Sequence, residues 1–166
     1  MAEPGKQQLL EAVLESWERN NRILVNLLRL VPEGGLEVRA MEGSPTVAQM
    51  FTHIHYGRMV LVLEDAPEFA RPMQKEEWLM ETDAGRIEAM LKESAQVVRE
   101  VLKNRMETGA EMKQHYDHPL LFLQHMIWHE GYHHGQIKLA LKLAGRAVSN
   151  EQAGPGTWRV WMSKTR

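Results

Sequence analysis

Four stretches of this chain carry apolar residues at helical spacing, and residues that stop helices separate them. The first stretch covers residues 6–30 and ends where Pro32 and two glycines follow. The other three cover residues 45–64, 84–104 and 119–145. Helices of this length joined by loops typically pack as an antiparallel four-helix bundle, so the sequence predicts an all-α fold.

The ends of these helices have recognisable signals. Ser44 is a suitable N-cap for the second helix, and Pro45 suits its first turn. Asp83 can cap the third helix, and Gly145 can end the fourth. These signals place the helix boundaries independently of the apolar pattern.

The C-terminal stretch, residues 146–166, is rich in Gly, Pro and polar residues and is predicted to be a loop. Trp158, Val160 and Trp161 are expected to pin it to the bundle. The chain has no internal repeat and no linker, and 166 residues fit one domain with a sizeable core. We therefore expect a single domain over residues 1–166.

The composition excludes several classes of protein. The chain has no cysteine, which rules out a disulfide scaffold, a thiolate zinc site and a cysteine nucleophile. Its net charge is −2 with scattered Lys and Arg, so no nucleic-acid or membrane surface is expected. No apolar run approaches the roughly 20 residues of a membrane span, and the N-terminus is polar. These features predict a cytoplasmic protein.

Histidines cluster in two of the predicted helices, which hold six of the eight in the chain. In the fourth helix, His129 and His133 are four residues apart, so both can reach one metal ion from the same face. His125 with His129 is a weaker alternative pair, and His134 is turned about 100° away from His133. The non-functional alternative is that these are core histidines satisfied by hydrogen bonds.

Residues 129–133 also read H-E-x-x-H, the motif of zinc metalloproteases, in which Glu130 would be the general base. No histidine follows His134, and Gln136 stands where the extended motif requires glycine. A zinc hydrolase is therefore the weaker alternative, and the third ligand is expected upstream.

The second helix supplies two candidates for that ligand, His53 and His55. They point about 160° apart, so only one can face the site. Periodicity is not decisive, but His53 shares its side with Gly57, which would leave space beside it.

The segments "SPTVAQMFTHI" and "HEGYHHGQI" resemble the corresponding segments of DinB/YfiT-like proteins, which are small four-helix metalloproteins. This resemblance implies that the metal ligands are His53, His129 and His133. His134 replaces an arginine that the family often has, and Glu130 falls at a variable position and is expected to be polar or solvent-facing. Gly135 is expected to permit close helix packing, and Gln136 to hydrogen-bond near the site.

The resemblance also implies a function. Three histidines leave open positions on a divalent metal ion, with zinc or nickel favoured. In some relatives such a site transfers a small-molecule thiol to an electrophilic substrate, so a metal-dependent transferase is expected. The alternative is a non-enzymatic, stress-response bundle that binds a metal or ligand. A homodimer is also implied, and Trp128, Trp158 and Trp161 could supply its interface.

Overall fold

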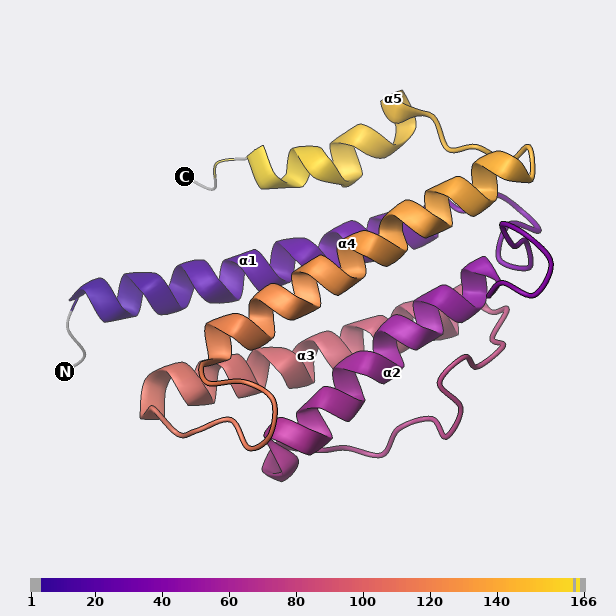
Figure 1. The fold of residues 1–166 in the computed structure, drawn as a ribbon. Helices are drawn as coiled ribbons and strands as arrows, with labels where there is room; N and C mark the ends of the chain where they lie inside the picture. The colour runs from indigo at the N-terminus through magenta and orange to yellow at the C-terminus, as the bar shows by residue number, and fades with distance from the viewer. Residues whose placement is uncertain (1–3, 163, 165–166) are drawn as a thin grey trace.

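Four long helices make up most of the chain (Figure 1). The computed structural model describes residues 4–162 and residue 164. The long helices are α1 (Pro4–Arg29), α2 (Val47–Asp65), α3 (Ala84–Thr108) and α4 (Pro119–Leu143). Within this described part of the chain there is no strand, and no helix is both long and apolar enough to cross a membrane. The predicted all-α four-helix bundle is confirmed.

The helices form two pairs that run in opposite directions. In Figure 1, α1 and α4 run one way, while α2 and α3 run the other. The connection between α2 and α3 therefore crosses the length of the bundle, beginning with the short 3-10 helix η1 (Pro67–Phe69). Long crossovers of this kind are a known variant of the four-helix bundle. This crossover is important here because it lies along α2, next to the histidines.

The start of α2 differs from the prediction by two residues. Its N-cap is Thr46, whose hydroxyl accepts a hydrogen bond from the Gln49 amide, while the Gln49 side chain accepts one from the Thr46 amide. This reciprocal capping box satisfies two amides at once. Ser44, the predicted cap, instead forms a local turn with Met41. At α3 the predicted cap is confirmed, since Asp83 accepts a hydrogen bond from the Arg86 amide.

The apolar core has two parts, one around Trp17 and Phe122 and the other around Phe51 and Ile137. On each of the four long helices, a buried polar residue lies between the two parts, and hydrogen bonds join these four residues across the bundle. These four residues, which we call the polar layer, are Asn20, Arg58, Ser94 and Glu130. Apolar periodicity gave no reason to expect this layer.

The predicted C-terminal loop is wrong, because this segment folds into three short helices. They are α5 (Asn150–Ala153), η2 (Gly154–Gly156) and η3 (Trp158–Met162). Ser149 and Gln152 form a capping box that starts the first of them. Figure 1 shows the segment returning along α1 and α4, and Arg19 donates to the carbonyls of Val160 and Trp161. Val160 is buried as expected, whereas Trp158 and Trp161 each remain 41% exposed.

Candidate metal centre

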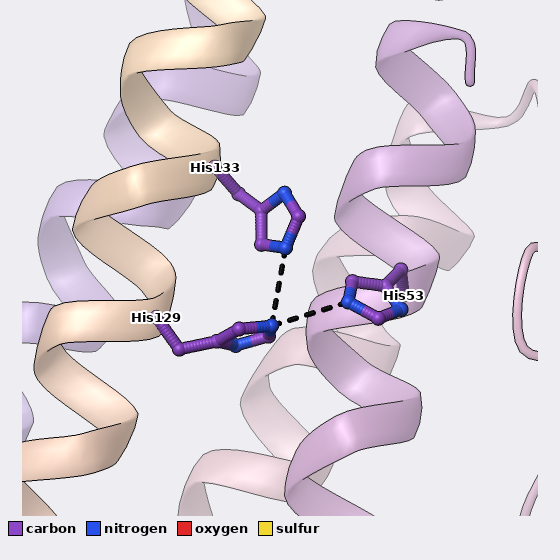
Figure 2. A group of neighbouring side chains, drawn as sticks. All are labelled: His53, His129 and His133. Carbon is purple, nitrogen blue, oxygen red and sulfur yellow. Dashed lines mark hydrogen bonds between the residues drawn. The ribbon is translucent and has the colours of Figure 1, made fainter. Parts of the chain in front are cut away.

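Three histidine side chains converge between α2 and α4 (Figure 2). His53 projects from α2, and His129 and His133 project from successive turns of α4. The Nε2 atom of His129 lies 3.1 Å from Nε2 of His53 and 3.1 Å from Nε2 of His133. One ligand atom from each of the three residues fits within 4.8 Å of the other two. The structure thus brings together the three residues that the sequence singled out.

The two separations of 3.1 Å match those of nitrogens bound to one metal ion. Zn–N bonds of about 2.0–2.1 Å place ligand nitrogens roughly 3.0 Å apart at right angles and roughly 3.4 Å apart in a tetrahedron. The two Nε2 distances of 3.1 Å lie in that interval. The donor set, three imidazoles and no thiolate, suits zinc, nickel, copper or iron. The residues present therefore fit a divalent transition-metal ion.

The crossover after η1 shapes the surroundings of His53. Trp78 stacks on the His53 ring, with centroids 4.0 Å apart and planes 5° from parallel. Oε1 of Glu77 lies 3.1 Å from Nδ1 of His53, close enough for an ion pair when the ring is protonated. The crossover is held in place because Gln49 donates to the carbonyl of Trp78 and Thr52 to that of Leu79.

Burial keeps the three imidazoles neutral. Desolvation, followed by the nearby His53 ring, lowers the pKa of His129 to about 4. Desolvation, followed by the neighbouring His129, also lowers the pKa of His133 to about 4. The pKa of His53 is lowered by burial and by His133, with Glu77 acting in the opposite direction. Neutral imidazoles are the form that binds metal, so the site needs no deprotonation near pH 7.

A cleft of about 510 Å³ opens beside the histidines. His53 and His133 form part of its wall, and His129 does not line it. Apart from these two rings, its lining has no charged side chain; it consists of Ala40, Met41, Ser44, Pro45, Met50, Trp78, Tyr132, Gln136 and Leu139. An ion held by the histidines would thus face a small-molecule-sized, largely apolar space on one side.

Comparison with known proteins places the chain in a family. The family model described as "DinB family" matches residues 1–154. The chain belongs to the DinB family. Searches of curated proteins and of solved structures find no match.

The other candidate histidines of this DinB-family chain lie outside the cluster. His55 is buried on the opposite side of α2, with Nδ1 2.7 Å from the carbonyl oxygen of Met90. Nδ1 of His125 is 2.6 Å from the hydroxyl of Tyr116. His134 is half-buried and not part of the cluster, as the helical wheel predicted. Of the two candidates on α2, only the His53 ring faces α4.

The expectation for Glu130 is wrong. Its side chain is not solvent-facing but 1% exposed, and it accepts two hydrogen bonds from Arg58, at 2.6 and 2.8 Å, and one from Asn20 at 2.5 Å. A carboxylate held this way cannot act as the general base of a zinc protease. The H-E-x-x-H motif in this DinB-family chain thus combines two cluster histidines with a structural glutamate.

Two further expectations have different outcomes. Gly135 is exposed, and a Cβ atom added there would meet no other atom within 4 Å, so close packing does not require this glycine. Gln136 lines the cleft and donates a hydrogen bond of 2.9 Å to the hydroxyl of Tyr132. Sequence reasoning missed Glu77 and Trp78 altogether, and nothing in the local pattern of the crossover distinguishes them.

Proposed function

We propose that this protein is a metal-dependent enzyme that binds a divalent ion, zinc or nickel, through His53, His129 and His133. The observation that carries the proposal is the convergence of three Nε2 atoms next to an apolar cleft. Three protein ligands are typical of catalytic ions, whereas structural zinc usually takes four. Once bound, such an ion lowers the pKa of a coordinated thiol or water and polarises an electrophile.

We further propose that the reaction transfers a low-molecular-weight thiol to an electrophile. In this reaction the thiol loses its proton to solvent, the sulfur forms a bond to the electrophilic carbon, and the leaving group departs with its electron pair. The chain has no cysteine of its own, so the thiol is a co-substrate. The uncharged cleft walls formed by Met41, Met50 and Leu139 would exclude water and hold the electrophile against the histidines. Membership of the DinB family supports this reaction class by resemblance.

The alternative is a non-enzymatic bundle whose ion or ligand serves only binding, including a stress-related role. The open cleft favours the enzyme, because a purely structural ion needs no space beside it. Hydrolysis at an H-E-x-x-H site is disfavoured because Arg58 and Asn20 already occupy the Glu130 carboxylate.

Elemental analysis of untagged protein, followed by a thiol-transfer assay, tests the proposal. We expect bound zinc or nickel in stoichiometric amount and activity with a thiol and an activated electrophile such as 1-chloro-2,4-dinitrobenzene. His133→Ala should abolish both. His134→Ala is the matched control, since it removes the adjacent histidine that lies outside the cluster. A metal-loaded protein that transfers no thiol to any electrophile would favour the binding bundle.

We also propose that a second copy of the chain covers an exposed face of α4. Large apolar residues on this face are seven and four residues apart, the spacing of a helix–helix seam. They are Leu121, Trp128, Tyr132, Leu139 and Leu143. Each of them is more than half exposed, so the stripe could form the apolar centre of a standard interface of ~800 Å² per partner. The stripe carries no charge, so it can pair with itself across a two-fold axis.

Sedimentation equilibrium tests the dimer directly. We expect twice the 19.1 kDa chain mass at micromolar concentration. Trp128→Lys should give a folded monomer, because this side chain is 67% exposed and lies outside the core. A wild-type monomer at that concentration would refute the interface.

A further inference from the structure

A second pocket adjoins the cleft beside the histidines. This neighbour, of about 360 Å³, shares Ser44, Pro45 and Trp78 with the cleft. Arg39, Gly43 and Gln49 complete its lining. A single ligand could therefore occupy both spaces by passing along the shared wall.

The two pockets differ in charge. The cleft has no charged side chain besides its two histidines, whereas the second pocket has one, Arg39. Arg39 forms no ion pair or side-chain hydrogen bond with any residue that the structure describes. Most other arginines are neutralised by carboxylates; these are Arg19, Arg29, Arg58, Arg71, Arg86, Arg99 and Arg105.

The backbone of Arg39 is also fixed. Arg39 pairs with Thr46 in an isolated antiparallel β-bridge, and Thr46 is the N-cap of α2. His53 lies about two turns farther along α2. The unneutralised guanidinium therefore stands on a segment held in a defined position relative to the histidines, so little backbone ordering would oppose ligand binding.

We infer that the two pockets form one binding site for an amphipathic organic acid. Its apolar body lies in the cleft beside His53 and His133, and its carboxylate, or an equivalent anionic group, pairs with Arg39. A planar guanidinium recognises a carboxylate through two parallel hydrogen bonds, and this gives orientation as well as attraction. The inference rests on the proposed function in one respect: it takes the end of the ligand beside His53 and His133 as the end that reacts. It assigns to one of the two substrates a carboxylate remote from the reacting atom.

A pair of probes that differ only in charge tests the site. They are 6-phenylhexanoate and its neutral amide, 6-phenylhexanamide, titrated into the metal-free protein by calorimetry. We expect the acid to bind roughly three- to fivefold more tightly at low salt, and less so at high salt, as for a partly exposed ion pair. Arg39→Gln should remove this preference. Arg22→Gln should retain it; this variant removes another exposed arginine, on α1, that has no ion pair or side-chain hydrogen bond with the residues that the structure describes.

A second variant locates the apolar body. Met41→Gln, at a side chain that lines the cleft and is 70% exposed, should weaken both probes equally. Equal affinity for acid and amide in the wild type would overturn the inference, as would unchanged binding in Met41→Gln.

Repeating the titration with zinc present separates this inference from the proposed function. A preference for the acid that appears only with zinc, and survives Arg39→Gln, would mean that the carboxylate binds the ion, and the inference would be wrong. Failure of thiol transfer would leave the metal-free titration unaffected, so the two ideas can fail independently.

Discussion

The polar layer and the histidine cluster are neighbours, since Glu130 directly follows His129. They differ in whether their buried polar atoms have hydrogen-bond partners within the protein. In the layer, no buried side-chain nitrogen or oxygen lacks a partner among the described residues. The Arg58 guanidinium donates hydrogen bonds to four groups: the side chains of Glu130, Asn21 and Ser94 and the carbonyl of Leu91. In the cluster, Nδ1 of His53 and Nδ1 of His133 have no hydrogen-bond partner among the described residues. The Nε2 atoms of the cluster face one another.

This difference separates a structural polar group from a binding site. A buried polar atom without a partner costs about 1–3 kcal/mol, so a fold retains such atoms where something else satisfies them. The layer is complete with the chain's own groups. In the cluster the Nε2 atoms have only one another as partners, and a single bound ion would satisfy all three at once; the two Nδ1 atoms would still lack a partner.

The largest expected effect comes from breaking the layer. Glu130→Leu leaves the Arg58 guanidinium buried without its carboxylate, and we expect the free energy of unfolding to fall by about 3–5 kcal/mol. Urea denaturation of the metal-free protein measures this. His133→Ala in the same assay should cost far less, because it removes a ring whose buried Nδ1 is already unsatisfied.

The double variant Arg58→Met/Glu130→Leu sharpens this result. Replacing both charges by apolar groups should recover much of the loss, since a buried ion pair and a hydrophobic pair of similar volume are often equally stable. If Glu130→Leu alone changes stability by under 1 kcal/mol, the layer is not the structural element described above.

Metal addition should affect only the cluster. Zinc or nickel at 100 times its Kd should stabilise the wild type by about 2.7 kcal/mol, because the folded chain binds the ion and the unfolded chain does not. Thermal melts with and without chelator measure the shift. His133→Ala should abolish it and His134→Ala should retain it. A shift that survives His133→Ala would place the ion elsewhere.

Acid should destabilise the metal-free cluster to a smaller extent. Burial holds the pKa of His129 and His133 at about 4 against an ordinary value of 6.5. Between these values the unfolded chain binds more protons than the folded chain, so the free energy of unfolding rises with pH. We expect full stability above pH 6.5 and a loss of about 1–2 kcal/mol as the pH falls toward 4, allowing for the partial exposure of the rings.

The variant His129→Asn/His133→Asn should flatten this pH dependence. Urea denaturation at intervals between pH 4 and pH 7 measures it. An unchanged slope would assign the acid sensitivity to other groups.

The smallest expected effect concerns Glu77. Because its carboxylate approaches Nδ1 of His53 from the exposed crossover, Glu77→Gln should weaken metal binding by up to about tenfold without changing the fold. Competition with a chromogenic chelator measures the affinity. Glu76→Gln is the control on the same segment, and equal effects in the two variants would argue against a specific role for Glu77.

The features predicted from sequence were those governed by local spacing. Apolar periodicity gave the four helices, and the four-residue interval between His129 and His133 put both rings on one face of α4. The features it missed depend on tertiary contacts. Glu130 has the sequence context of a surface residue until Arg58 of α2 is brought against it.

Sequence-based prediction failed for the crossover and for the C-terminal tail, and the reasons are related. The crossover has no periodicity, so its sequence could not indicate that Trp78 stacks on His53. The tail is rich in Gly and Pro, yet its short helices form because Val160 is buried and Arg19 binds its carbonyls. At α2, two overlapping cap signals competed, and the reciprocal bonding of Thr46 with Gln49 prevailed.

The polar layer also fixes the sliding position of α2 along α4. A slip of one helical turn would move α2 by about 5.4 Å, a displacement that apolar residues repeating every turn could accommodate with modest repacking. Arg58 would then lose Glu130, and both charges would be buried without partners. The same slip would move His53 by about 5.4 Å, which is more than the 4.8 Å within which the three ligand atoms now lie. The buried ion pair thus sets the register in which the three histidines can meet.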